Sequence, residues 1–194
     1  MRKVVLASKS PRRRELLENI GLKFSVIVTD TDESQVSKEL EPGLYVRELS
    51  LLKATAAARF AEKNSFVIGA DTIVVFEGEI LGKPKDKDEA AYMLRKLSGR
   101  VHSVYTGITV TDTNNMHSVS EYEKTDVSFR ELSDREINHY INHYNVLDKA
   151  GAYGIQEFAS AFVNSIHGDY FNIVGLPVCR LCTLVSKEYG EELV

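Results

Sequence analysis

The sequence predicts a mixed α/β fold for this chain of 194 residues, and three patterns support it. Short apolar runs rich in β-branched residues alternate with segments whose apolar residues recur at helical spacing. Near the middle, two segments of alternating character flank the polar turn TNNM, as in a long antiparallel hairpin. Since we find no repeat, low-complexity tract or linker, we expect one domain over residues 1–194.

The chain is expected to begin with a strand, a loop and a helix. KVVLA is a nearly continuous apolar run, typical of a strand that is buried on both faces. Ser10 and Pro11 fit the N-cap and the first residue of a helix, and Gly21 fits its left-handed C-terminal position. FSVIV is expected to form a second strand, which the acidic loop TDTDES follows.

A long helix is predicted from Pro42 to about Lys63, with Lys53 beside its apolar stripe. The residues of that stripe are Tyr45, Leu49, Leu52, Ala56 and Phe60. FVIGADTIVVF then predicts one strand or a pair of strands, which the turn EGE joins to ILGKP.

The second half begins with a helix over Ala90, Met93, Leu94 and Leu97 that Gly99 ends. Capping boxes are predicted at the starts of two helices, from Asp86 with Glu89 and from Ser133 with Glu136. The segment DKAGAYGIQ, residues 148–156, lacks a helical period and is expected to be a loop. A C-terminal helix completes the domain.

Composition excludes several classes of protein. The chain is 43% hydrophobic with a net charge of −4, and this balance argues against a protein that coats nucleic acid. Its apolar runs fall well short of the roughly 20 residues that span a bilayer. The basic start followed by only VVLA is too short for a signal peptide. We therefore expect a soluble cytoplasmic protein without a membrane partner.

Two possible metal or redox motifs have a simpler interpretation. Cys179 and Cys182 form a C-x-x-C, but the spacing of a buried helix face, which favours packing, is found at Val178, Leu181, Cys182 and Val185. His139 and His143 have the spacing of a metal pair, yet the glutamate of H-E-x-x-H is missing. Both histidines are expected on the flank of an apolar helix face.

Phosphate binding is predicted where the first strand runs into the first helix. In open α/β sheets ligands lie beyond the carboxyl ends of strands, and helix N-termini favour anions. Arginine suits phosphate because its planar fork donates paired hydrogen bonds and stays charged. A basic first turn opposes the helix dipole unless an anion lies above it, whereas Arg14 alone fits a solvated charge. The candidate ligands are Ser8, Ser10, Arg12 and Arg13.

Two carboxylates are candidates for a metal site. Asp71 ends the apolar run FVIGA and Glu33 ends the loop after the second strand, so both could face the same cleft. Carboxylate oxygens close to bound phosphate suit Mg²⁺ or Mn²⁺. The alternative is that Asp71 caps a turn beside Thr72.

These residues resemble the Maf family of nucleotide pyrophosphatases. ASKSPRR, Glu33, Lys53, GADT, GKP, SGR with YTG, DKAGAYGIQ and GLP occur in the family's order, over about residues 3–186. The resemblance implies a Maf/inosine-triphosphatase-like mixed sheet with flanking helices and two lobes around a central cleft. It also implies a divalent metal, a homodimer, and hydrolysis of a nucleoside triphosphate to its monophosphate and pyrophosphate.

Within that family the chain resembles the branch that acts on dTTP and UTP. That branch has arginine after SP, threonine after GAD and glutamine after GI, which are Arg12, Thr72 and Gln156 here. A glutamine amide can match the O4 and N3–H edge of uracil or thymine. Glu157 and Phe158 depart from the small residues usual in the family, so the rim of the base pocket and the range of bases stay open.

The resemblance also implies roles for the site residues. Water would attack the α-phosphorus, with Asp71 orienting or deprotonating it and with Glu33 and Asp71 holding the metal. Arg13, Lys53 and Lys83 would bear on the triphosphate, to which Ser8 and Ser10 would donate hydrogen bonds. Two other functions stay open: a hydrolase for deaminated purine triphosphates, and a non-catalytic division regulator that binds nucleotide or nucleic acid.

Overall fold

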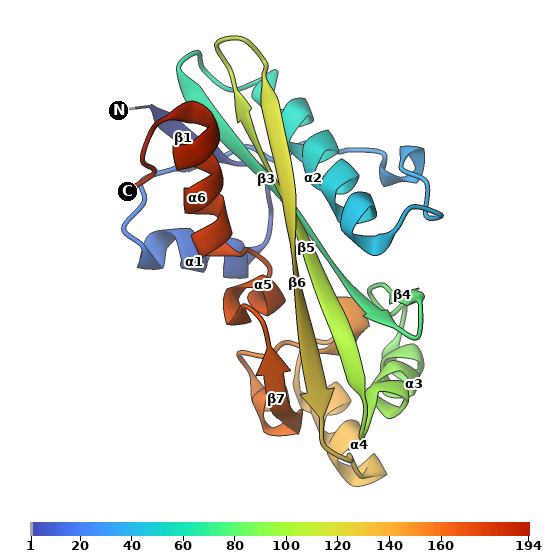
Figure 1. The fold of residues 1–194 in the computed structure, drawn as a ribbon. Coiled ribbons are helices and arrows are strands. Elements are labelled where there is room, and N and C mark those ends of the chain that lie inside the picture. Colours follow the sequence, from blue (N-terminus) through green and yellow to red (C-terminus); the bar gives the residue numbers. More distant parts are fainter. Residues whose placement is uncertain (1) are drawn as a thin grey trace. The chain divides into compact units, whose positions relative to one another are not determined.

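A seven-stranded sheet with helices around it forms the fold of the computed structural model, which describes residues 2–194 (Figure 1). The predicted mixed α/β class is thus confirmed. The strand order is β2-β1-β3-β5-β6-β7, and β4 pairs with β3. The strands are β1 (Lys3–Leu6), β2 (Ser25–Val26), β3 (Ser65–Phe76), β4 (Glu79–Leu81), β5 (Val101–Asp112), β6 (Ser118–Phe129) and β7 (Val163–His167).

Residues 2–194 also form six α-helices and three short 3₁₀ segments, and the last two helices follow the last strand. The helices are α1 (Pro11–Asn19), α2 (Pro42–Ala58), α3 (Lys87–Leu97), α4 (Asp134–His143), α5 (Tyr170–Val174) and α6 (Val178–Tyr189). The 3₁₀ segments are η1 (Glu33–Gln35), η2 (Ala150–Ala152) and η3 (Phe158–Phe162).

The chain divides into two compact units. The first unit contains the chain up to Asp71, Thr106–Glu123 and Gly175–Val194. The second unit contains Thr72–Tyr105 and Lys124–Val174. The strands β3, β5 and β6 each contribute residues to both units.

In the first unit, β1 is a central parallel strand whose sequence explains its place. It pairs in parallel with β2 on one side and with β3 on the other, and its last three residues are buried. A strand that is covered on both faces needs an unbroken apolar run, which KVVLA supplies. The β1–α1 loop then leads into α1 at Pro11, and Gly21 has the predicted positive φ, of 74°, just beyond the helix.

The helix α2 lies unusually close to the sheet of the first unit, at two glycines. A Cβ atom added to Gly69 of β3 would lie 2.3 Å from the backbone oxygen of Ser50 and 2.7 Å from the backbone nitrogen of Ala54. One added to Gly107 of β5 would lie 2.1 Å from the backbone oxygen of Val46. Because only glycine lacks that atom, these two positions allow the helix backbone to rest directly on the strands.

Hydroxyl groups add to this attachment of α2. Ser50 Oγ lies 2.7 Å from Thr109 Oγ1 of β5, which in turn lies 2.7 Å from Ser120 Oγ of β6. The Ser50 hydroxyl also donates to the backbone oxygen of Arg47, at 2.8 Å. Side-chain hydrogen bonds between buried groups hold a helix in one position more narrowly than apolar contact does.

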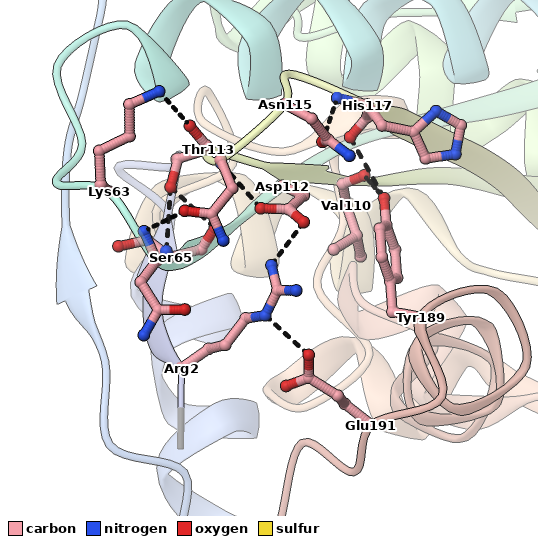
Figure 2. A network of polar contacts seen from close by, with 12 residues as sticks. Arg2, Lys63, Ser65, Val110, Asp112, Thr113, Asn115, His117, Tyr189 and Glu191 are labelled. Atoms are coloured by element: carbon pink, nitrogen blue, oxygen red, sulfur yellow. Dashed lines mark hydrogen bonds and ion pairs between the residues drawn. The ribbon is translucent and has the colours of Figure 1, made fainter.

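The C-terminal segment is tied to the first strand by a polar network in the first unit (Figure 2). Arg2 Nη1 lies 2.5 Å from Asp112 Oδ2, and Arg2 Nε donates to Glu191 Oε1 at 2.7 Å. Burial pushes the pKa of Asp112 upward, but hydrogen bonds from Arg2 and Asn114 and the Arg2 charge bring that pKa below its ordinary value overall. The Tyr189 hydroxyl donates to the Val110 oxygen at 2.8 Å, which fixes the end of α6.

In the second unit, aromatic rings pack around a buried histidine. His102 of β5 makes edge contacts with Phe129 and Tyr153, at centroid distances of 4.9 and 5.4 Å. Its Nε2 atom lies 2.8 Å from the Tyr153 hydroxyl. Burial lowers the pKa of His102 to about 4, while the charge of Asp126 opposes part of that shift. The imidazole is therefore neutral at physiological pH.

Burial of His102 predicts an acid-sensitive fold. An unfolded histidine titrates near pH 6.5. Because the folded pKa of about 4 is lower, the unfolded chain binds the extra proton between these values and stability falls as the pH falls. From pH 7 to pH 5 we expect a loss of about 2 kcal/mol in the free energy of unfolding. Urea unfolding of His102→Gln should show a much flatter pH dependence, and an equal slope in both proteins would contradict this assignment.

Several predicted elements differ from those observed. The long helix ends at Ala58 rather than near Lys63, because the Phe60 N–H bonds to the Ala57 oxygen and tightens the last turn. Phe60 is 73% exposed, so the predicted stripe is wrong there, and Leu52 and Ala56 are only half-buried. Tyr45 and Leu49 of the predicted stripe are buried as expected. The other buried residues of the helix are mostly small, which suits its closeness to the sheet: Gly43, Val46, Ser50, Ala54, Ala57 and Ala58.

Two smaller elements also need correction. Only Ser25–Val26 of FSVIV forms a strand, at the edge of the sheet. The Asp86 carboxylate accepts the Glu89 N–H at 2.8 Å as predicted, but the Glu89 carboxylate accepts from Lys85 instead of closing a capping box. The capping box of Ser133 and Glu136, the β5–β6 hairpin and the end of α3 just before Gly99 are confirmed.

The remaining motifs of the sequence are structural. Leu181 and Val185 of α6 are buried as predicted, whereas Val178 and Cys182 are only half-buried. Cys179 is exposed, and both thiols are free. Burial raises the pKa of the Cys182 thiol, so the structure does not favour redox use. His139 and His143 are exposed and stack on one another at a centroid distance of 4.3 Å.

Candidate active site

The loop between β1 and α1 holds Ser8, Ser10 and Arg13 in a hydrogen-bonded group. The Ser10 N–H and the Arg13 Nη1–H both donate to Ser8 Oγ, each at 3.2 Å. Arg13 Nε donates to the backbone oxygen of Gly175 at 2.8 Å. Gly175 is the glycine of the GLP motif, and its φ of 123° favours glycine. The motifs ASKSPRR and GLP therefore meet in the first unit.

The N-terminus of α1 is prepared for an anion rather than capped by a side chain. Ser10 is the N-cap residue, but its hydroxyl makes no capping hydrogen bond. The first turn holds no acidic residue. It includes both arginines of ASKSPRR, Arg12 and Arg13, which are half-buried. Unsatisfied N–H groups and guanidinium groups at one helix end are typical of a phosphate site.

Asp71 lies within β3 rather than at its end. The strand continues from Ser65 to Phe76, and Asp71 and Thr72 are its only residues that are not buried. The alternative in which Asp71 caps a turn is therefore wrong. A carboxylate in a buried strand needs a partner, because burial of an unpaired charge is costly.

Lys53 is that partner, and it also contacts the second predicted carboxylate. Its Nζ atom contacts Asp71 Oδ1 and lies 2.8 Å from Glu33 Oε1. The side chains of Lys53 and Asp71 are 20% and 15% exposed, whereas that of Glu33 is 52% exposed. The structure thus brings together all three residues of this group, which we call the Glu33–Lys53–Asp71 cluster.

Local structure explains how each member reaches the cluster. Glu33 opens η1, and the side chain of Asp32 caps this segment by accepting the Ser34 N–H at 3.1 Å. Because Asp32 caps η1, the side chain of Glu33 is not needed for capping. Lys53 projects from α2, which the glycine contacts hold against β3 and β5, and Asp71 follows Gly69 by two residues. Successive strand residues alternate in direction, so Gly69 and Asp71 lie on the same face of β3.

Charge connects the cluster with Arg13. Burial lowers the pKa of Arg13, while the negative charges of Asp71 and Glu33 oppose that shift. An arginine stays protonated even so. The two carboxylates therefore favour the positive charge of the Arg13 guanidinium, and the site combines anionic and cationic groups.

One residue of this site, Tyr45, was not predicted from the sequence. Tyr45 of α2 was assigned only to the apolar stripe, and it is indeed buried. Burial raises the pKa of its phenol, and the negative charges of Asp71 and Glu33 raise it further. The phenol is therefore an uncharged polar group beside the cluster. Its position eight residues before Lys53 on the same helix was the signal available in the sequence.

The donor set of the cluster fits a hard divalent cation. Glu33 and Asp71 supply carboxylate oxygens, which Mg²⁺ and Mn²⁺ prefer. Residues 2–194 contain no group of three or more histidine, cysteine or acidic side chains suited to a metal ion. Mg²⁺ commonly uses one or two carboxylates together with water and substrate phosphates, so two carboxylates are sufficient.

The other predicted site residues belong to the second unit. Lys83 is exposed just after β4, Thr72 is half-buried, and Gln156 is exposed directly after the buried Ile155. Gln156 makes no side-chain hydrogen bond to any residue in the described range 2–194. Its amide is available to a ligand.

A buried lysine supports the loop that carries Gln156. Lys149 is 4% exposed, and its ammonium group contacts the Asn145 oxygen, Asp148 Oδ1 at 3.0 Å and Glu157 Oε1 at 3.4 Å. The unusual Glu157 therefore neutralises this lysine. Phe158 packs on rings of α4, including Tyr140 at a centroid distance of 5.9 Å. The departures at residues 157 and 158 thus have structural roles in the second unit.

Comparison with known proteins agrees with these motifs. The family model described as "Maf-like protein" matches residues 3–188. A dTTP/UTP pyrophosphatase of Thermoanaerobacter sp. (strain X514) is 50% identical over 192 residues, which cover 99% of this chain and 100% of that protein. A dTTP/UTP pyrophosphatase of Alkaliphilus metalliredigens is 47% identical over 194 residues, with 100% of both chains covered.

A solved structure gives a weaker match. The Staphylococcus aureus Ham1 protein aligns with a TM-score of 0.46 at 18% identity, covering 66% of this chain and 71% of that chain. This likeness is too low to support an inference about fold or activity.

Proposed function

The chain belongs to the Maf-like protein family, and from that premise we propose that it hydrolyses dTTP and UTP to the monophosphate and pyrophosphate. The observation that carries the proposal is the Glu33–Lys53–Asp71 cluster with Arg13 in its electric field. The substrate class is supported by relatives about half identical over their full length, whose names state this activity.

In the proposed reaction, the first unit binds the triphosphate and activates water. Arg13 neutralises phosphate charge, and Ser8 and Ser10 donate hydrogen bonds to phosphate oxygens, with Arg12 as a further ligand. Asp71 orients the attacking water and accepts its proton. Its place in a rigid strand suits this role, since positioning supplies much of the rate of phosphoryl transfer. Lys53 and Lys83 stabilise charge on the departing pyrophosphate.

A divalent cation completes the proposal. Glu33 and Asp71 would hold it, as their oxygen donors allow, and when bound it supplies a Lewis acid for the phosphate oxygens. Tyr45 keeps an uncharged hydroxyl beside the two carboxylates.

For base selection we propose Gln156, with Thr72 and Arg12 as further determinants. The amide of Gln156 can donate to O4 of uracil or thymine and accept from N3–H. Cytosine presents an amino donor at position 4 and an unprotonated N3, so an amide in this orientation would make neither bond. The ion pair between Lys149 and Glu157 anchors the residue that follows Gln156 in this loop.

Replacement of Gln156 tests base selection. In Gln156→Leu the O4 and N3–H groups would lose their partners in a desolvated pocket, at a cost on the order of 1–3 kcal/mol. We expect kcat/KM for UTP and dTTP to fall roughly ten- to a hundred-fold while that for purine triphosphates changes little. The control Ser160→Leu adds the same side chain at an exposed position of η3. If Gln156→Leu kept its preference for UTP over GTP, base selection would have to come from Arg12 and Thr72.

A panel of nucleotides with pyrophosphate detection tests the function itself. The proposal predicts fast release of pyrophosphate from UTP and dTTP with Mg²⁺ or Mn²⁺. Preferred hydrolysis of ITP and XTP would instead identify a hydrolase for deaminated purines. Tight binding of nucleotide without turnover would identify a non-catalytic regulator, in which the two carboxylates have no role.

We also propose a cytoplasmic homodimer in which residues 1–194 act as one Maf-like domain. The family resemblance supports the dimer, and the −4 net charge gives no reason to expect nucleic acid as a partner. Within residues 2–194, the helices are all too short or too polar to cross a bilayer. Light scattering during size-exclusion chromatography measures the mass, and a monomer at micromolar concentration would contradict the proposed dimer.

A further inference from the structure

Lys53 occupies the point at which the two candidate metal ligands converge. Its ammonium group contacts Asp71 Oδ1 and lies 2.8 Å from Glu33 Oε1, so one lysine bridges both carboxylates. All three side chains belong to the first unit. A bridging cation lowers the repulsion between two carboxylates that face one another.

A divalent cation held by both carboxylates would lie close to the same place as the ammonium group. Mg²⁺ bonds to oxygen at roughly 2.0–2.1 Å, which is shorter than the 2.8 Å between Lys53 Nζ and Glu33 Oε1. Lys53 already takes up one oxygen of each carboxylate, and the like charges of an ammonium group and a divalent cation repel one another at this short range. Lysine and metal are therefore alternatives at this point.

We propose that Lys53 competes with the divalent cation for Glu33 and Asp71, so that metal binds tightly only together with a triphosphate that accepts the lysine. This inference rests on the proposed function, because it assigns both the metal and the triphosphate to this site. Binding of metal and of nucleotide then reinforce one another, as linkage requires. The free enzyme holds little metal.

The local structure allows such an exchange. Lys53 has a flexible four-carbon stem, and Glu33 is carried by the three-residue segment η1 with its side chain 52% exposed. Asp71 is held in the middle of β3. The lysine and one carboxylate can therefore move while the other carboxylate stays in place.

Direct binding of Mn²⁺ tests the competition without any measurement of activity. Electron paramagnetic resonance of free Mn²⁺ gives its dissociation constant for the nucleotide-free protein. We expect Lys53→Met and Lys53→Gln to bind Mn²⁺ at least about ten-fold more tightly than the unmodified protein, since both remove the competing charge. Two neutral variants are used so that poor folding of one, seen by circular dichroism, leaves the other as the test.

Two controls separate competition from a general charge effect. Lys53→Arg keeps the charge and should leave Mn²⁺ affinity within about three-fold of the unmodified protein. Lys63 lies in the same unit, where its ammonium group donates to the Thr113 oxygen. Lys63→Met removes this charge and should also leave the Mn²⁺ affinity unchanged. Mn²⁺ should also raise the melting temperature more in Lys53→Met than in the unmodified protein. Equal or weaker Mn²⁺ binding by both neutral variants would overturn the inference.

A non-hydrolysable analogue, α,β-methylene-UTP, distinguishes the two proposals. It should strengthen Mn²⁺ binding in the unmodified protein more than in Lys53→Met, in which no lysine remains to be moved. The neutral variants could bind Mn²⁺ more tightly while the unmodified protein neither binds nor hydrolyses the nucleotide. That result would support the competition and reject the proposed function. Turnover of UTP with no gain of Mn²⁺ affinity in those variants would reject the competition alone.

Discussion

Asp71→Asn is expected to lower kcat for UTP about 1,000-fold or more while the protein stays folded. The substitution keeps the shape of the side chain and removes the charge that accepts a proton and binds metal. Loss of a positioned general base alone costs roughly 10²- to 10⁴-fold. Lys53 keeps its contact with Glu33 in the variant, so the cluster is not left without a counter-charge. Steady-state release of pyrophosphate with Mg²⁺ or Mn²⁺ measures the effect.

A matched control for this prediction is Asp30→Asn. Asp30 is a fully exposed carboxylate of the same unit, and its ion-pair distance to Lys9 is 4.0 Å. We expect its activity to stay within two-fold of the unmodified protein, because exposed pairs at such distances contribute little. If Asp71→Asn also retained activity within a few-fold, the assignment of Asp71 would be wrong.

Gly69→Ala is expected to destabilise the protein by about 3 kcal/mol or more. The new methyl group would lie 2.3 Å from the Ser50 oxygen and 2.7 Å from the Ala54 nitrogen, which are backbone atoms of α2. Overpacking typically costs about 1–3 kcal/mol, and it costs more where backbone has to move. Because α2 carries Lys53, the displacement should also lower kcat. Urea unfolding and kinetics on the folded fraction measure the two effects.

Gly82→Ala is the control for Gly69→Ala. A Cβ atom at Gly82 would meet no atom within 4 Å, so we expect a change in stability below about 0.5 kcal/mol. Similar unfolding curves for Gly69→Ala and Gly82→Ala would show that α2 does not depend on its close approach to the sheet.

Much of the fold follows from local sequence signals. The buried strand KVVLA, the capping box of Ser133 and the left-handed Gly21 are each specified by neighbouring residues, and the structure contains all three. The end of α2 was predicted wrongly because apolar spacing continues through Phe60 although the chain has to turn into β3. That turn depends on tertiary packing, which helical periodicity does not report.

The site was only partly predictable for a related reason. Arginines after a first strand and carboxylates at a strand indicate phosphate and metal, and the structure brings Glu33, Lys53 and Asp71 together. The bridge made by Lys53 could not be predicted, because it depends on how closely α2 approaches β3. Tyr45 was missed because a buried tyrosine at helical spacing is not distinguishable by sequence from a core residue.

Hydrolysis of UTP in ¹⁸O-labelled water tests directly whether water attacks the α-phosphorus. Attack of water on the α-phosphorus places one ¹⁸O atom in UMP and none in pyrophosphate, and mass spectrometry of the two products shows this. We expect UMP that carries the label, with unlabelled pyrophosphate, and Asp71→Asn should abolish the formation of both products. Label in the pyrophosphate, or release of UDP with inorganic phosphate, would contradict it, because the attack would then be at a different phosphorus.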